Sequence, residues 1–254
     1  MKPKRVLIVS SRMQCEGKTV QWVPEVYPKL LMQYGIVPVI VPTMGITPKI
    51  LQEYLNNYDG LLLIEGGDVH PQRYSDTWNE NDFKDCDTLK DEIEFQCFAH
   101  AYIGRKPILG IGRGMHVINV ALGGTLAADI HQHRNAATNH IDYDKDHSLC
   151  NEIEIAPRTP LMYWYKRRIL SVNSSHNQRI GKLGDYLIDM AHDAKGVING
   201  IYIPHYPFLI GLQFHLGSIL DEDEDNKLVL MKFIDAVSPS WSPSAWESFA
   251  PKKW

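Results

Sequence analysis

The sequence predicts an α/β protein with a mostly parallel sheet, helices on both faces of the sheet, and extra short strands in its second half. The main observation is that short, nearly continuous apolar runs alternate with segments of helical periodicity through the first half. Strands of that kind are buried on both faces, as they are in parallel sheets covered by helices. The second observation is the length, because 254 residues are enough for one large domain with a full core.

The elements of the first half follow in regular order. Strands are predicted at 5–11, 37–42, 60–67 and 106–112, and helices at 22–35, 46–58 and 85–103, with a further helix directly after residue 112. The residues after the first strand, SSRMQCEGK, are expected to form a loop. In parallel sheets functional residues gather at the carboxyl ends of the strands, so the segments after these strands carry the candidate site.

The second half is less regular. The runs EIEIAP, RILSVNSS, YLIDMA, GVINGIYI and FLIGLQF predict short strands, some of them antiparallel, before a last helix in KLVLMKFIDAV. We therefore assign residues 1–238 to a single domain and residues 239–254 to a C-terminal tail rich in Ser, Pro and Trp.

Composition excludes several function classes. The chain is 44% hydrophobic and 22% charged with a formal net charge of −4, which gives no electrostatic case for binding nucleic acid or an anionic membrane. Apolar stretches are strand-length, short of the roughly 20 residues that a membrane span needs. Four cysteines without a CxxC pair indicate free thiols, so we predict a cytoplasmic protein without a disulfide framework.

The segment GIGRGMHVINV, residues 110–120, predicts a strand, a tight glycine turn and a helix. Many α/β enzymes present a nucleophile on such an elbow, yet the residue at the apex is Gly112. A residue with a Cβ at such an apex is usually strained by about 1–3 kcal/mol, and glycine avoids that strain. One interpretation is therefore an elbow retained for packing.

Four segments in order carry a resemblance to a known family: GLLLIEGGDVHPQRY, KPILGIGRGMHVINVALGGTLAADI, VNSSHNQRI and GLQFHLGSIL. Together they resemble the class I glutamine amidotransferase-like family, and within it the γ-glutamyl-amine hydrolase branch typified by γ-glutamyl-γ-aminobutyrate hydrolase. The resemblance implies a flavodoxin-like fold and a small γ-glutamyl or amino-acid ligand. The resemblance implies neither a cofactor nor a bound metal.

The family's catalytic centre carries over unevenly. The resemblance implies a Cys nucleophile, a His that takes the thiol proton, and a Glu that orients the His. His215 matches the catalytic His, whereas Gly112 replaces the Cys and Gly217 replaces the Glu. Glu65 stands where the family often has a glycine.

The resemblance implies further binding positions. Gly66 and Gly67 match the glycine turn on the oxyanion side, Arg113 matches the far side of the elbow, and His116 stands where many members have a substrate-contacting Gln. The remaining candidates for ligand binding are Asp68, Tyr74, Asn173, Ser174 and His176. For Asp68 and Asn173, bonding to nearby backbone in a turn is an equal alternative.

Three hypotheses follow from this pattern. The first is a degenerate family member that binds a γ-glutamyl-type ligand or a partner protein with little or no hydrolysis. The second is an enzyme that acts on a C–N bond through a rebuilt catalytic centre containing His215 and His116. Cys15, or a metal bound by several of the histidines, would assist that centre. The third, a variant of an active hydrolase, explains Gly112 but not Gly217. Assembly stays open between a homo-oligomer and a subunit that works beside a synthase.

Overall fold

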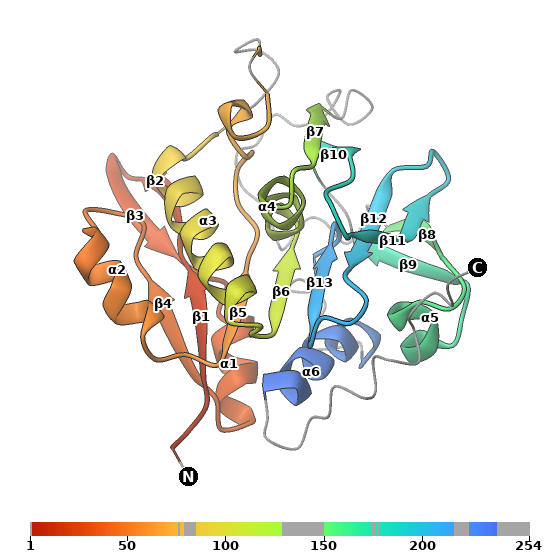
Figure 1. Cartoon of the computed structure of the whole chain (residues 1–254), viewed down its shortest axis with the longest axis horizontal. Helices are drawn as coiled ribbons and strands as arrows, with labels where there is room; N and C mark the ends of the chain where they lie inside the picture. Colours follow the sequence, from red (N-terminus) through yellow and green to blue (C-terminus); the bar gives the residue numbers. More distant parts are fainter. Residues whose placement is uncertain are drawn as a thin grey trace.

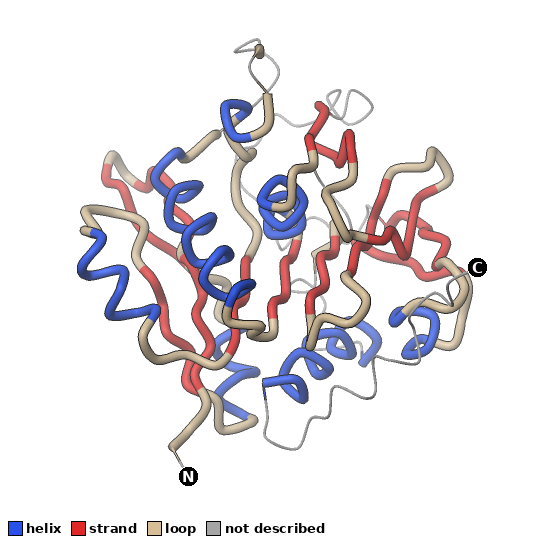
Figure 2. Tube along the Cα trace, viewed as in Figure 1, coloured by secondary structure: helices blue, strands red, loops and turns tan. Residues whose placement is uncertain are grey.

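The computed structural model describes residues 2–75, 77–78, 85–128, 150–173, 176, 178–215 and 224–237. A nine-stranded mixed sheet forms its centre (Figures 1 and 2), in the order β4-β1-β5-β6-β13-β12-β11-β8-β9. These strands are β1 (Arg5–Val9), β4 (Val37–Val41), β5 (Gly60–Leu63), β6 (Ile108–Ile111), β8 (Cys150–Ile155), β9 (Ile169–Asn173), β11 (Ile188–Asp193), β12 (Ile198–Tyr202) and β13 (Leu209–Leu212). The predicted α/β class is confirmed.

The sheet is parallel in one half and antiparallel in the other. Strands β4, β1, β5, β6 and β13 pair in parallel, whereas β13–β12, β12–β11, β11–β8 and β8–β9 pair antiparallel. Every residue of β5, β6 and β13 is buried, as expected from their continuous apolar runs. The prediction of short, partly antiparallel strands in the second half is also confirmed.

Helices cover both faces of the sheet (Figure 1). One core packs strands against α1 (Val26–Gln33), α5 (Pro160–Tyr165) and α6 (Glu224–Val237), and the other packs them against α2 (Pro48–Leu55), α3 (Thr88–Ile103) and α4 (Arg113–Ala121). Successive residues of β1 alternate between the two cores, with Val6 and Ile8 in one and Leu7 and Val9 in the other. This alternation is the two-residue period of a strand buried on both faces.

The helix starts follow local capping chemistry. Thr47 accepts a hydrogen bond from the Ile50 amide at 3.3 Å and is followed by Pro48, which suits the first position of α2. Asp87 caps α3 by accepting bonds from the amides of Leu89 and Lys90 at 3.1 Å each. The Asp87 cap thus fixes the start of α3, the helix that carries the buried charged residues Lys90, Asp91 and Glu94.

The segment after β1 corrects a sequence prediction. Residues expected to form a loop form a hairpin of β2 (Ser11–Cys15) and β3 (Lys18–Trp22), closed by a two-residue turn. Glu16 and Gly17 have φ values of 50° and 74°, the positive pair that a tight hairpin turn requires. Because β3 extends to Trp22, α1 begins at Val26 and not at residue 22 as predicted.

Further short elements escaped the sequence prediction. They are β7 (Thr125–Ala128) and β10 (Gln178–Lys182), which pair with each other, together with α5 and a 3₁₀ turn η1 (Pro71–Arg73). The predicted tail, residues 239–254, lies outside the described residues. None of the helices in the described part of the chain has both the length and the apolar character that crossing a bilayer requires.

Candidate functional site

Gly112 forms the apex of a tight turn between β6 and α4. Its φ and ψ values are 56° and −113°, and its amide donates a hydrogen bond to the Leu212 carbonyl at 2.7 Å. A residue with a Cβ rarely adopts this conformation. The expected strand–elbow–helix is therefore present, and the expectation of a strained apex that glycine relieves is confirmed.

We predict that Gly112→Ala lowers the free energy of unfolding by about 1–3 kcal/mol because of this backbone strain. Space is a smaller obstacle, because the added Cβ would lie 3.3 Å from His215 Cε1 and 3.4 Å from Glu65 Cγ. Gly196→Ala is the comparison for backbone strain without crowding, since Gly196 has a φ of 78° with nothing within 4 Å of its added Cβ. Urea unfolding measures both variants: backbone strain predicts a loss in both, and an unchanged unfolding free energy for Gly112→Ala would contradict the prediction.

Glu65 and His215 meet directly beside this apex. Glu65 Oε1 lies 3.4 Å from His215 Nδ1, and the Tyr27 hydroxyl donates a short hydrogen bond to the same oxygen. Both side chains are buried, with 1% of Glu65 and 6% of His215 exposed. His215 is also fixed through its backbone, whose amide donates to the Asn173 carbonyl at 2.9 Å.

The sheet order explains why these three residues meet. Glu65 follows β5, Gly112 follows β6 and His215 follows β13, and these are three neighbouring strands whose carboxyl ends share one edge. The sequence shows Glu65 only as a departure from a glycine turn. Its position after a strand that neighbours the elbow strand is the signal that could have placed it beside His215.

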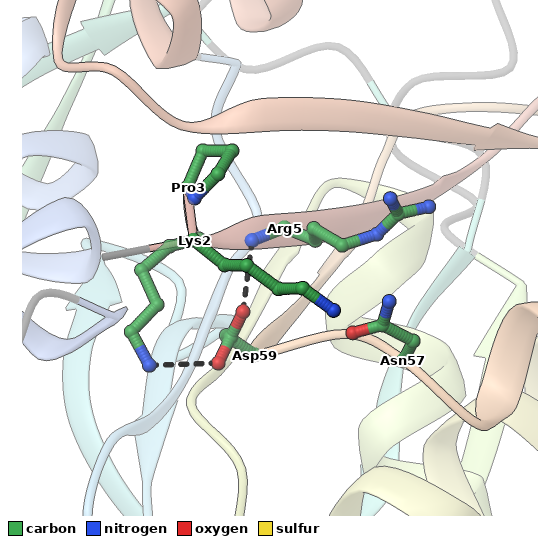
Figure 3. A pocket seen from close by; sticks show the side chains of 6 residues that line it. Lys2, Pro3, Arg5, Asn57 and Asp59 are labelled. Carbon is green, nitrogen blue, oxygen red and sulfur yellow. Dashed lines mark hydrogen bonds and ion pairs between the residues drawn. The ribbon is translucent and has the colours of Figure 1, made fainter.

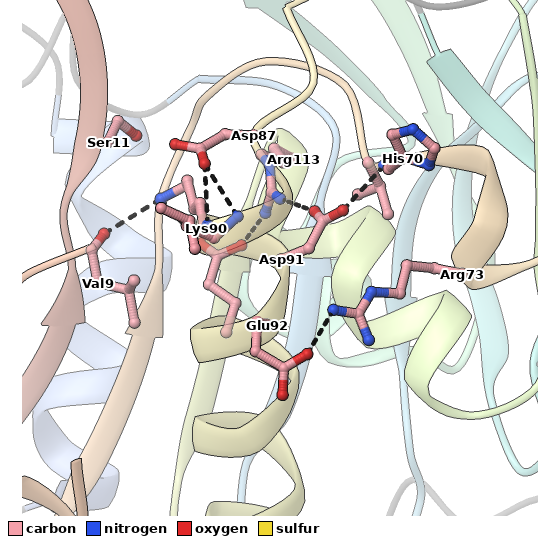
Figure 4. Close-up of polar contacts among 12 residues, drawn as sticks. Val9, Ser11, His70, Arg73, Asp87, Lys90, Asp91, Glu92 and Arg113 are labelled. Carbon is pink, nitrogen blue, oxygen red and sulfur yellow. Dashed lines mark hydrogen bonds and ion pairs between the residues drawn. The ribbon is translucent and has the colours of Figure 1, made fainter. Parts of the chain in front are cut away.

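A buried ionic cluster supports the elbow from α3 (Figure 4). Arg113 pairs with both Asp91 and Glu94, and Lys90 pairs with Glu94 at 2.9 Å. Lys90 also donates to the carbonyls of residues 9 and 10 at 3.2 Å, at the end of β1. Burial, followed by the neighbouring Arg113 guanidinium, lowers the pKa of Lys90 well below its ordinary value. The cluster thus ties α3, the elbow and β1 together.

The glycine turn after β5 leaves no room for side chains. A Cβ on Gly66 would lie 3.0 Å from Arg113 Cδ, and one on Gly67 would lie 2.1 Å from the Asp85 carbonyl oxygen. Ser11 donates to the Glu65 carbonyl at 2.8 Å, which fixes the turn from β2. These contacts hold Glu65 in register with the elbow.

His116 lies inside the protein under the elbow. Its Nε2–H donates to Gln213 Oε1 at 2.7 Å, and only 4% of the residue is exposed. Burial lowers the pKa of His116 to about 3, although the bond to Gln213 acts in the opposite direction. The imidazole is therefore neutral and serves as a fixed donor.

Gln178, which is not among the predicted site residues, contacts the turn after β5. Gln178 accepts from the Val69 amide at 2.9 Å, and its amide nitrogen donates to the Val69 carbonyl at 3.0 Å and to the Tyr74 hydroxyl at 3.2 Å. Asp68 is buried in this turn, with 7% exposed. Gln178, from the segment VNSSHNQRI, thus contacts two residues of the segment GLLLIEGGDVHPQRY, Val69 and Tyr74.

The other candidates divide into described and undescribed residues. Asn173 is buried, and His176 is half-buried. Ser174, Gly217 and the histidines of residues 131–147 lie outside the described residues. Cys15 is at the exposed end of β2, four residues beyond Ser11, whereas Cys97 is buried and its pKa is raised by burial to about 12.

Two cavities of the described residues lie away from the elbow. The described residues contain no group of three or more His, Cys, Asp or Glu side chains that could hold a metal ion. A cavity of about 380 Å³ lies at the opposite, amino end of β1 (Figure 3). Its lining residues are Lys2, Pro3, Lys4, Arg5, Asn57 and Asp59. Another of about 290 Å³ lies between α2 and α3.

The half-parallel sheet and the elbow at its carboxyl edge define a protein of the class I glutamine amidotransferase-like fold. Its sequence matches the Peptidase C26 family over residues 6–216. The chain belongs to that family.

Individual relatives agree with this membership. The chain is 28% identical to Protein NtpR of Enterococcus hirae over 79% of this chain and 83% of that protein. It is 25% identical to the γ-glutamyl-γ-aminobutyrate hydrolase of Escherichia coli over 82% of this chain and 83% of that protein. A glutamine amidotransferase of Thermotoga maritima has a similar fold, with a TM-score of 0.55 and 14% identity over 98% of this chain and 95% of that chain.

Proposed function

We propose that the protein binds a γ-glutamyl or related amino-acid ligand at the elbow, with little or no release of glutamate. The observation that carries the proposal is the apex itself. Gly112 offers no nucleophile, and the Glu65 and His215 side chains pack within 3.4 Å of where a Cβ at 112 would stand. The ligand class is supported by the E. coli relative's name and by the γ-glutamyl-hydrolase motifs around the elbow.

Glu65 opposes the family's covalent route in two ways. A carboxylate beside a thiol disfavours the thiolate, because like charges raise the thiol pKa. It also lies at the glycine turn, where the family is expected to stabilise a negatively charged oxygen. Glycine at 112 and glutamate at 65 are therefore compatible with each other and jointly incompatible with thiol catalysis.

The test is glutamate release from L-glutamine and γ-glutamyl-γ-aminobutyrate, together with calorimetric binding of both compounds. We expect the natural protein to bind without releasing glutamate above a His215→Ala control. Gly112→Cys alone is expected to stay inactive, because Glu65 remains. The combination Glu65→Gly, Gly112→Cys and Gly217→Glu should gain at least about a hundredfold, since loss of the nucleophile in triad enzymes costs about a millionfold.

The control is the same triple variant with His215→Ala, which should lose the gained activity. Binding without activity in the natural protein, followed by activity in the triple variant, would support the proposal. Glutamate release by the natural protein, abolished by His215→Ala, would overturn it.

The pair of Glu65 and His215 favours a second candidate, hydrolysis of a C–N bond by water. A carboxylate facing Nδ1 orients the imidazole and leaves Nε2 to accept a proton from water, which is general-base catalysis. In that case Glu65→Gln should lower the rate by roughly 10²–10⁴-fold. The pH profile of glutamate release by the natural protein, with His215→Ala as the blank, separates this candidate from the first.

A further inference from the structure

Buried charge at the elbow is unbalanced. Among the described residues, the buried carboxylates are Glu65, Asp68, Asp91 and Glu94, and the buried lysine and arginine side chains are Lys90 and Arg113. Asp68 has an interaction of its own, which leaves the three carboxylates of Glu65, Asp91 and Glu94 beside the two cations at the elbow and on the adjoining face of α3. A buried carboxylate without a compensating partner is costly, so this site favours an additional positive charge.

Glu65 is the carboxylate that lacks a compensating Lys or Arg among these residues. Arg113 and Lys90 are engaged by Asp91 and Glu94 on α3. Glu65 Oε1 has the Tyr27 hydroxyl and His215 Nδ1 as neighbours, but Oε2 is buried and has no hydrogen-bond partner among the described residues. The Glu65 side chain lies over the apex, with Cγ 3.4 Å from the position of an added Cβ on Gly112.

We propose that Glu65 binds a protonated amine of the ligand at the apex, beside His215, where the family's thiol would otherwise stand. This proposal rests on the proposed function and names the group that the site recognises. An ammonium has three N–H donors and a compact positive charge, which suit an unpartnered carboxylate oxygen. Within the proposed ligand class, this selects the related amino acid that carries a terminal ammonium.

The test compares three amino acids that share their α-groups and chain length. L-ornithine has a terminal ammonium, L-glutamine has a neutral amide there, and L-norvaline has neither. We expect calorimetry to show that L-ornithine binds at least about tenfold more tightly than the other two, because a desolvated charge pair is replaced by a neutral contact. Glu65→Gln should abolish this preference.

A control variant and a melting measurement keep the test independent of folding. Glu152→Gln makes the same change on an exposed residue of β8 and should keep the preference for L-ornithine. Thermal melting of Glu65→Gln should be no lower than that of the natural protein, since an uncompensated buried charge is removed.

The outcomes separate this proposal from the proposed function. Equal binding of L-ornithine and L-glutamine would overturn amine recognition and leave the proposed function standing. Glu65-dependent binding of n-butylammonium over n-butanol, without binding of any amino acid, would overturn the proposed function and keep amine recognition. No binding by any probe would overturn both, and stoichiometric divalent metal lost on Glu65→Gln would overturn amine recognition in favour of a metal.

Discussion

Arg113→Met is expected to destabilise the protein by about 3–5 kcal/mol, because it leaves buried carboxylates without their partner. The guanidinium pairs with Asp91 and Glu94, and only 4% of Arg113 is exposed. Methionine fills a similar volume, so the expected loss reports charge and not packing. Urea unfolding at neutral pH measures it.

The expected loss depends on pH because Asp91 can take up a proton. Burial already raises the pKa of Asp91, although Arg113 acts against that rise. Without Arg113 the carboxyl protonates more readily, so the loss should be smaller at pH 5 than at pH 8.

An exposed pair provides the control for Arg113. Arg168 and Glu154 lie 2.5 Å apart with 73% and 50% of their side chains exposed, so Arg168→Met should cost no more than about 1 kcal/mol. Adding Asp91→Asn and Glu94→Gln to Arg113→Met should recover part of the lost stability. A loss below about 1 kcal/mol for Arg113→Met would show that the cluster does not support the elbow.

Hydrophobic patterning was sufficient to predict the parallel half of the sheet. Strands β5 and β6 are entirely buried, so every residue had to be apolar or glycine, and that produces an unmistakable run. The hairpin β2–β3 escaped because its strands are partly exposed and carry mostly polar residues. Its turn residues, Glu16 and Gly17, are not one of the pairs, such as Asn-Gly or Asp-Gly, that by themselves indicate a two-residue hairpin turn.

The candidate site was predictable where it depends on motifs and unpredictable where it depends on neighbours across the sheet. Gly112 and His215 follow from the elbow and the GLQFH segment. The contact of Glu65 with His215 joins residues 150 positions apart, and it depends on β5 and β13 flanking β6. A pattern in one segment carries no information on that order.

The pair of Gly112 and Glu65 also changes how the missing nucleophile is understood. Glycine alone would leave an open apex, whereas here a glutamate side chain lies over it. The two departures from the expected family pattern therefore lie at one place, with the His215 imidazole beside the Glu65 carboxylate. The third hypothesis, a simple variant of an active hydrolase, does not account for that pairing.

His116 should make the protein less stable in acid. Burial lowers its pKa in the folded state to about 3, helped by His176 and Arg113, against about 6.5 in the unfolded chain. The unfolded state therefore binds the extra proton between pH 6.5 and pH 3, so stability falls by about 1.4 kcal/mol per unit as the pH drops through that range. At pH 5 the loss due to His116 is about 2 kcal/mol.

His116→Gln keeps a donor for Gln213 without a titrating group, so its unfolding free energy should fall less than that of the natural protein between pH 7.5 and pH 5. His192→Gln, which removes an imidazole from the partly exposed pair with Asp189, controls for the loss of a histidine elsewhere. An identical pH dependence in both variants would show that protonation of His116 is not what destabilises the folded protein in acid.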